Sequence, residues 1–128
     1  MLFRSEAPLL DVDLGMQYCG GSDDIYDTIL GLFLDMFEEK SAELVKCYTD
    51  QNWENYTINI HSLKSNALNI GAKRLSDLCL ELELAGKNIR AGVQVEEETA
   101  FILENHPIVM KLYEETYEEV KKLTEEKR

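Results

Sequence analysis

Apolar residues recur at intervals of three or four along nearly the whole chain, and no stretch alternates with a period of two for long enough to form a sheet. This spacing is that of amphipathic helices. Only two prolines and seven glycines interrupt the 128 residues, so we expect long helices with short connections. The predicted fold class is therefore all-α, an antiparallel up-and-down four-helix bundle with a short N-terminal helix.

Capping residues and helix breakers divide the chain. The glycine pair at 20–21 is expected to end a short first helix, and Ser22 to cap the helix that follows. Asp50 is expected to cap the next long helix and Gly71 to end it, while Pro107 opens the last helix at a position where its missing N–H does no harm. We expect helices over about 12–18, 22–48, 53–70, 75–89, 95–104 and 107–123.

The whole chain, residues 1–128, is expected to form one domain, because no linker, repeat or low-complexity tract divides it. Its net charge of −12 argues against binding to nucleic acids and to anionic membranes, which attract surfaces rich in lysine and arginine. No apolar run reaches the roughly 20 residues of a membrane span, and residues 1–6 lack the long apolar stretch of a signal peptide. We therefore expect a cytoplasmic monomer.

The three cysteines, Cys19, Cys47 and Cys79, are odd in number and widely spaced. This pattern fits neither a disulfide framework nor the paired ligands of a zinc site. We expect three reduced thiols in the core and no metal bound by the chain.

His61 is the residue of chemical interest. It follows the core position Ile60, so its side chain points about 100° away from the buried stripe. Lys64, Ser65 and Leu68 lie on the same outward face, one and two turns further on. An ammonium group beside an imidazole disfavours a metal, but it suits a neutral imidazole nucleophile that becomes negatively charged on phosphorylation. The small Ser65 would let another protein's active site approach the ring.

Periodicity alone leaves this interpretation of His61 weak, because a single histidine on a helix surface is most often only a solvated polar residue.

His106 has a plainer interpretation. It precedes Pro107 and is expected at a helix start. The acidic runs are expected to be solvated helix faces.

The longer string around His61 resembles the active-helix motif of histidine-containing phosphotransfer (HPt) domains. The family pattern is a histidine, a lysine three positions later, a small residue at four and Gly-Ala at ten and eleven. This sequence matches each position with His61, Lys64, Ser65, Gly71 and Ala72. The resemblance covers about 12–123 and includes, outside the motif, Asp13, Gly15, the glycine pair at 20–21, Tyr26, Leu30, Phe33, Leu78, Leu82, Glu83, Asn105, His106, Pro107 and Tyr113.

The resemblance implies a role for each matched residue. His61 would accept the phosphoryl group through Nε2, and Lys64 would balance its charge. Ser65 stands where the family most often has glycine, and Leu68 is larger than the residue many members have there. Glu83, on the facing helix, would hydrogen-bond the other ring nitrogen, although a solvated glutamate is an equal alternative.

The resemblance also implies partners. A stand-alone protein of bacterial type would exchange phosphoryl groups with response-regulator receiver domains, including that of a hybrid sensor kinase, and Mg²⁺ would be bound by the receiver. Docking would use Leu68, Leu14 and Met16, while Ser65, Gly71 and Glu83 would support the site. The chain has no nucleotide site, so it would be a phosphocarrier and not an enzyme.

A competing interpretation is a non-catalytic helical adaptor that binds a partner through its surface. The presence of both the histidine and the lysine favours the phosphocarrier over the adaptor. A metal-dependent or hydrolytic enzyme is disfavoured, because no spaced set of carboxylates accompanies either histidine.

Overall fold

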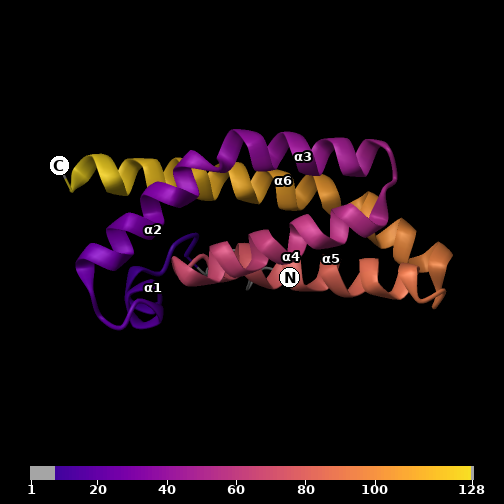
Figure 1. Ribbon diagram of the computed structural model, residues 1–128, viewed down its shortest axis with the longest axis horizontal. Helices are drawn as coiled ribbons and strands as arrows, with labels where there is room; N and C mark the ends of the chain where they lie inside the picture. The colour runs from indigo at the N-terminus through magenta and orange to yellow at the C-terminus, as the bar shows by residue number, and fades with distance from the viewer. Residues whose placement is uncertain (1–7, 128) are drawn as a thin grey trace.

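The computed structural model describes residues 8–127, and this part of the chain consists of six α-helices without a strand (Figure 1). The helices are α1 Val12–Tyr18, α2 Asp23–Asp35, α3 Phe37–Thr49, α4 Trp53–Asn69, α5 Lys73–Arg90 and α6 Val95–Glu126. The expectation that residues 1–6 carry no signal peptide falls outside the described residues. Within the described part, no helix is long and apolar enough to cross a membrane.

The helices form the predicted bundle. Helices α3, α4, α5 and α6 run alternately in opposite directions, and α2 leads into α3 at one end (Figure 1). Helices α4 and α5 make the most extensive contact, α6 packs along α5, and the short α1 contacts α2 and α4 at the end of the bundle. The all-α fold with a short N-terminal helix is therefore confirmed.

The core contains the apolar stripes that the spacing predicted, and it centres on aromatic side chains. Tyr26, Phe33, Tyr56 and Tyr113 are almost completely buried. Phe33 meets Tyr113 edge to face, with the ring centroids 5.6 Å apart. The three cysteines are free and buried, as expected.

The prediction of one helix over 22–48 is wrong in one respect. These residues form two helices, α2 and α3, which meet at Met36. The backbone of Met36 stays in the right-handed helical region, and its N–H still bonds to the carbonyl of Leu32, so the break changes direction without a loop. Its cause is packing. Phe37 begins α3 with its ring stacked on Tyr117 and edge-on to Tyr113, both on α6. Neither proline nor glycine stands at the break, so no residue type in the sequence marks it.

The predicted cap of α4 is also wrong. Asn52, and not Asp50, accepts a hydrogen bond from the backbone N–H of Asn55. Asp50 instead ends α3, where its carboxylate pairs with Lys46 one turn earlier.

A third correction concerns Pro107, which lies inside α6 and does not begin a helix. Proline has no N–H for the carbonyl four residues earlier, which here belongs to Leu103. The hydroxyl of Tyr48 donates to that carbonyl oxygen at 3.4 Å. A hydroxyl from α3 thus replaces the donor that the proline lacks, and the expected helices over 95–104 and 107–123 are continuous.

His106 is accordingly a buried residue within α6, and not a residue at a helix start. Its Nδ1 lies 2.9 Å from the hydroxyl of Tyr56, and its ring stacks on Tyr48 with the centroids 3.8 Å apart. Burial lowers the pKa of His106 to about 4. The ring therefore stays neutral in the folded protein at ordinary pH.

The close approach of α4 and α5 depends on Gly86. A Cβ atom at this position would lie 1.9 Å from Oγ1 and 3.1 Å from Cβ of Thr57. The Thr57 hydroxyl is itself bonded to the carbonyl of Trp53 at 2.6 Å, so it cannot move aside freely. Only glycine lets the two helices come this near.

We predict that Gly86→Ala lowers the free energy of unfolding by about 1–3 kcal/mol, because the added methyl overpacks the contact with Thr57. Gly31→Ala is the matched control, since Gly31 is also helical but has nothing within 4 Å of its would-be Cβ. The control should instead gain about 0.5–1 kcal/mol from helix propensity. Urea denaturation measures both, and equal effects of the two substitutions would contradict this account.

We also predict an acid-dependent loss of stability from His106. The unfolded chain binds a proton at this ring near pH 6.5, while the folded chain binds it only near pH 4, so acid favours the unfolded state. As pH falls from 6.5 to 4, this group should cost up to about 3 kcal/mol of stability. His106→Gln should flatten the pH profile of unfolding over that range. A His106→Gln profile as steep as the wild type would count against burial as the cause.

Candidate functional site

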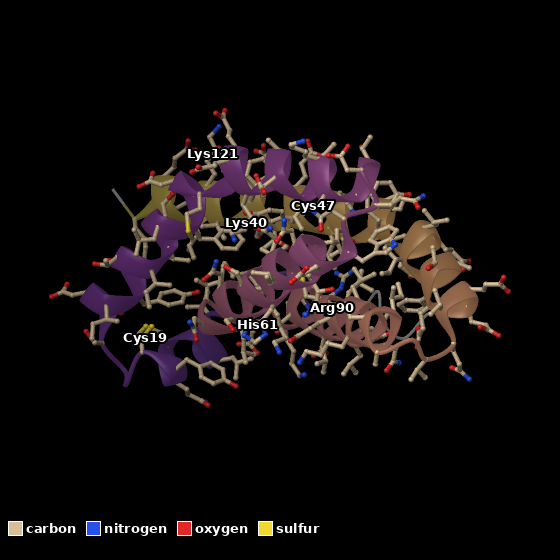
Figure 2. The ribbon with its side chains drawn as sticks, turned by 45° about the vertical axis from the view of Figure 1, so that its right-hand side comes forward. Cys19, Lys40, Cys47, His61, Arg90 and Lys121 are labelled. Carbon is tan, nitrogen blue, oxygen red and sulfur yellow. The ribbon has the colours of Figure 1, made fainter. Side chains whose placement is uncertain are left out.

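His61 lies on α4 and faces outward, as its place beside the core stripe predicted. Its side chain is 58% exposed, while its neighbour Ile60 is fully buried. Figure 2 shows it on the side of the bundle away from α3. The imidazole is therefore open to a second protein.

Glu83 projects from α5 and holds one nitrogen of this ring. Its Oε2 lies 2.7 Å from Nδ1 of His61, and the side chain is only 2% exposed. The predicted cross-helix contact therefore exists, and the alternative of a solvated glutamate is wrong. The contact lies one helical turn from the close approach at Gly86, which brings the two helices near enough for it.

Two lysines complete the cluster around this carboxylate. Nζ of Lys64 lies 2.7 Å from Oε1 of Glu83, and Nζ of Lys87 lies 3.1 Å from Oε2. Lys64 is mostly covered, with 24% of its side chain exposed, whereas Lys87 is well exposed. Lys87 was not among the residues predicted from the sequence. Its position four residues after Glu83 on one helix is the spacing of an intrahelical ion pair and could have indicated it.

These contacts fix the charge of Glu83. Burial by itself would raise the pKa of this carboxyl, but hydrogen bonds from Lys64, His61 and Lys87 outweigh burial and lower the pKa to about 2. Glu83 is therefore ionised and can only accept hydrogen bonds. Nδ1 of His61 must then carry a hydrogen, and in the neutral form of the ring this leaves the lone pair on Nε2.

The surface beside His61 is hollowed between α1, α4 and α5. The hollow has a volume of about 340 Å³, and its apolar wall is formed by Tyr18, Leu68 and Leu80. Ser65 lies on its rim and is exposed. The helix α1 contributes Tyr18 to this surface, while Leu14 and Met16 are half-buried and do not line the hollow.

Gly71 supports the site indirectly. Its φ of +89° is left-handed, and a Cβ there would lie 2.0 Å from the carbonyl oxygen of Asp11. The N–H of Asp11 donates to the carbonyl of Gly71 at 2.9 Å. Gly71 thus ends α4, as predicted, and lets the chain before α1 pack against that end.

Lys40 contacts Ser62, the residue after His61, but it does not belong to the cluster around His61. Its Nζ donates to the hydroxyl of Ser62 at 2.9 Å, on the side of α4 that faces α3 (Figure 2). Burial lowers the pKa of Lys40. Among residues 8–127, no three His, Cys, Asp or Glu side chains come together in a way that could hold a metal ion.

Comparison with known families agrees with this geometry. The family model described as the Hpt domain matches residues 28–122. The chain belongs to the Hpt domain family. An Hpt domain takes part in histidine phosphotransfer within phosphorelays and is a phosphocarrier, not a kinase. No curated protein sequence matches the chain significantly.

The fold is also that of a solved Hpt domain. The crystal structure of the HPT domain from the Hpt sensor hybrid histidine kinase from Shewanella superposes with a TM-score of 0.77 and 20% sequence identity. The match covers 92% of this chain and 95% of that one. At this identity, the likeness establishes the shared helical fold.

We predict that Glu83 selects the Nδ1–H form of His61. Near pH 8, ¹⁵N NMR should show a protonated Nδ1 and an unprotonated Nε2 in the wild type, because an ionised carboxylate can only accept a hydrogen bond. Glu83→Gln keeps an acceptor and should largely retain this form. Glu83→Leu removes the acceptor and should shift the hydrogen toward Nε2. A tautomer unchanged in the Glu83→Leu variant would contradict the assignment.

Proposed function

We propose that this Hpt domain carries a phosphoryl group on Nε2 of His61, accepting it from the aspartate of one receiver domain and passing it to the aspartate of another. The observation that carries the proposal is the exposed imidazole whose Nδ1 is held by the buried, ionised Glu83. This arrangement leaves a lone pair on Nε2, the nitrogen that a partner can approach.

The transfer needs no proton to leave the attacking nitrogen. The Nε2 lone pair forms a bond to phosphorus as the bond from phosphorus to the donor aspartate oxygen breaks, and that oxygen keeps the electron pair. The ring gains a positive charge, and its Nδ1–H remains bonded to Glu83. In the return step the acceptor aspartate attacks phosphorus, and the electron pair of the P–N bond returns to Nε2. Mg²⁺ would be bound by carboxylates of the receiver, not by this chain.

Lys64 is the proposed counterion of the phosphoryl group. It lies one turn beyond His61 on the same face of α4, and its Nζ is already within the cluster at 2.7 Å from Glu83. A lysine on a long flexible stem can turn from the carboxylate to the phosphoryl oxygens and offset their charge there. The small, exposed Ser65 leaves the approach to the ring open.

The proposed receiver-binding surface is the apolar surface around His61. Leu68, Tyr18 and Leu80 form the apolar part of the adjacent hollow, whose remaining lining is polar: Lys64, Ser65, Lys73, Ser76 and Asp77. Two further exposed side chains flank the site: Ile58 lies one turn before His61 on α4, and Leu84 follows Glu83 on α5. The half-buried Leu14 and Met16 would contribute at its margin. An apolar surface around a polar centre is the usual composition of a protein interface.

The experiment that tests the function is phosphoryl transfer from a panel of phosphorylated receiver domains. The wild type should gain a label that is labile in acid and stable in base, and His61→Gln should gain none. His106→Gln is the matched control, because it removes the buried histidine and should still be labelled. If no receiver labels the wild type, or if His61→Gln is labelled equally, the phosphocarrier proposal fails and the adaptor becomes the better interpretation.

The expectations of a monomeric and cytoplasmic protein stay predictions. So does that of a stand-alone protein, since the solved relative is one domain of a hybrid kinase. The mass of the product that carries this sequence in its source cells tests the last of these expectations. A separate protein would have a mass near 14.7 kDa.

A further inference from the structure

The carboxylate of Glu83 forms ion pairs with two lysines, and these lysines lie on different helices. Lys64 is on α4 with His61 and contacts Oε1, whereas Lys87 is on α5 with Glu83 and contacts Oε2. The Oε2 atom also accepts the Nδ1–H of His61. One buried carboxylate is thus paired with two cations, one more than its charge requires.

The proposed reaction takes one of these cations away. A phosphoryl group on Nε2 draws Lys64 toward its oxygens, and Lys64 then leaves Oε1 of Glu83. If Lys64 were the only lysine there, a carboxylate of 2% exposure would keep as its counterion only the phosphorylated ring, whose positive charge is already offset by its own phosphoryl group. Removing one partner of a buried ion pair is strongly unfavourable, and the negative phosphoryl group nearby would make it more so.

Lys87 is placed to prevent this. It lies four residues after Glu83 on the same helix, with the acidic residue first, which is the favourable orientation for such a pair. Its Nζ reaches Glu83 from the solvent side, with 59% of the side chain exposed. The contact therefore does not depend on where Lys64 points.

We propose that Lys87 is a positioning residue for phosphotransfer, which keeps Glu83 neutralised while Lys64 leaves that carboxylate for the phosphoryl group. The inference rests on the proposed function. Lys87 acts through Glu83 and not on the phosphoryl group, so its effect must depend on the charge of Glu83.

A double-mutant cycle tests this dependence. Lys87→Met in the wild-type background should slow labelling of His61 by a phosphorylated receiver about tenfold, the change that corresponds to one pKa unit of lost charge interaction. In a Glu83→Gln background the same substitution should change the rate less than about twofold. Lys87→Arg should restore most of the wild-type rate. Equal slowing in both backgrounds, or none in either, would overturn the inference.

Lys46→Met is the matched control for the charge change. Lys46 is also an exposed lysine in an i,i+4 pair with an acidic residue, but it lies on α3 with Asp50 as its partner. Its loss should leave the labelling rate unchanged. A slowing equal to that of Lys87→Met would show that only the net charge matters, and it would overturn the assignment to Lys87.

A second measurement needs no phosphotransfer. Lys64→Met imitates the departure of Lys64, and ¹³C NMR reports the titration of the Glu83 carboxyl. With Lys87 present, the pKa of Glu83 should stay well below its ordinary value, and in Lys64→Met/Lys87→Met it should rise by a further unit or more, roughly the effect of one adjacent charge. If Lys64→Met alone raises the pKa as far as the double substitution, Lys87 does not hold the carboxylate.

The outcomes separate this inference from the proposed function. A wild-type chain that no receiver labels would overturn both. A labelled wild type whose Lys87 and Glu83 substitutions show no coupling would overturn only the role of Lys87.

Discussion

The candidate site depends on how closely α4 and α5 approach one another. Gly86 permits that approach, because any side chain there would meet Thr57. One turn away, the same approach places Glu83 within 2.7 Å of His61. An imidazole on one helix and a carboxylate on the other can be in direct contact only when the two backbones are close. Gly86, which has no side chain, therefore sets the geometry of the contact between His61 and Glu83.

Glu83 then determines the chemistry of His61. It is buried, and burial on its own would raise the pKa of this carboxyl, but the neighbouring Lys64, His61 and Lys87 keep it ionised. Ionisation makes it a pure acceptor, and a pure acceptor fixes the hydrogen on Nδ1. In the proposed function, Nε2 is the nucleophile because the buried carboxylate of Glu83, kept ionised by the lysines, holds the hydrogen on Nδ1.

The sequence predicted the parts of this structure that are local. The spacing of apolar residues placed Ile60 in the core and His61 outside it, and the glycine at 71 ended α4, because helix periodicity and left-handed backbone conformation are properties of short segments. The resemblance to HPt domains pointed to Glu83 as the partner across the helices. The spacing of residues along one helix could not identify this partner, because the register between two helices is a tertiary property.

The errors arose where tertiary contacts outweigh local signals. Pro107 is a helix breaker by every local rule, but the hydroxyl of Tyr48 supplies the hydrogen bond that it removes from Leu103. The break at Met36 has the opposite cause, since a sequence suited to one helix is divided by the stacking of Phe37 on α6. Lys87 was missed for a third reason. A lysine on an acidic surface gives no signal by itself, and its importance is seen only once the structure shows that Glu83, four residues earlier, is buried.

The charges of the cluster suit a phosphorylated ring better than a free one. With a neutral imidazole, Lys64 and Lys87 outnumber Glu83, and the cluster carries one positive charge although the whole chain carries −12. In the proposed loaded state the phosphoryl group brings about two negative charges and the ring gains one positive charge, so the cluster becomes neutral. Without Lys87 the same state would hold an unbalanced negative charge beside a buried carboxylate. If the proposed function holds, the second lysine is not needed to balance Glu83 in the resting protein but is needed to balance the charge of the phosphorylated one.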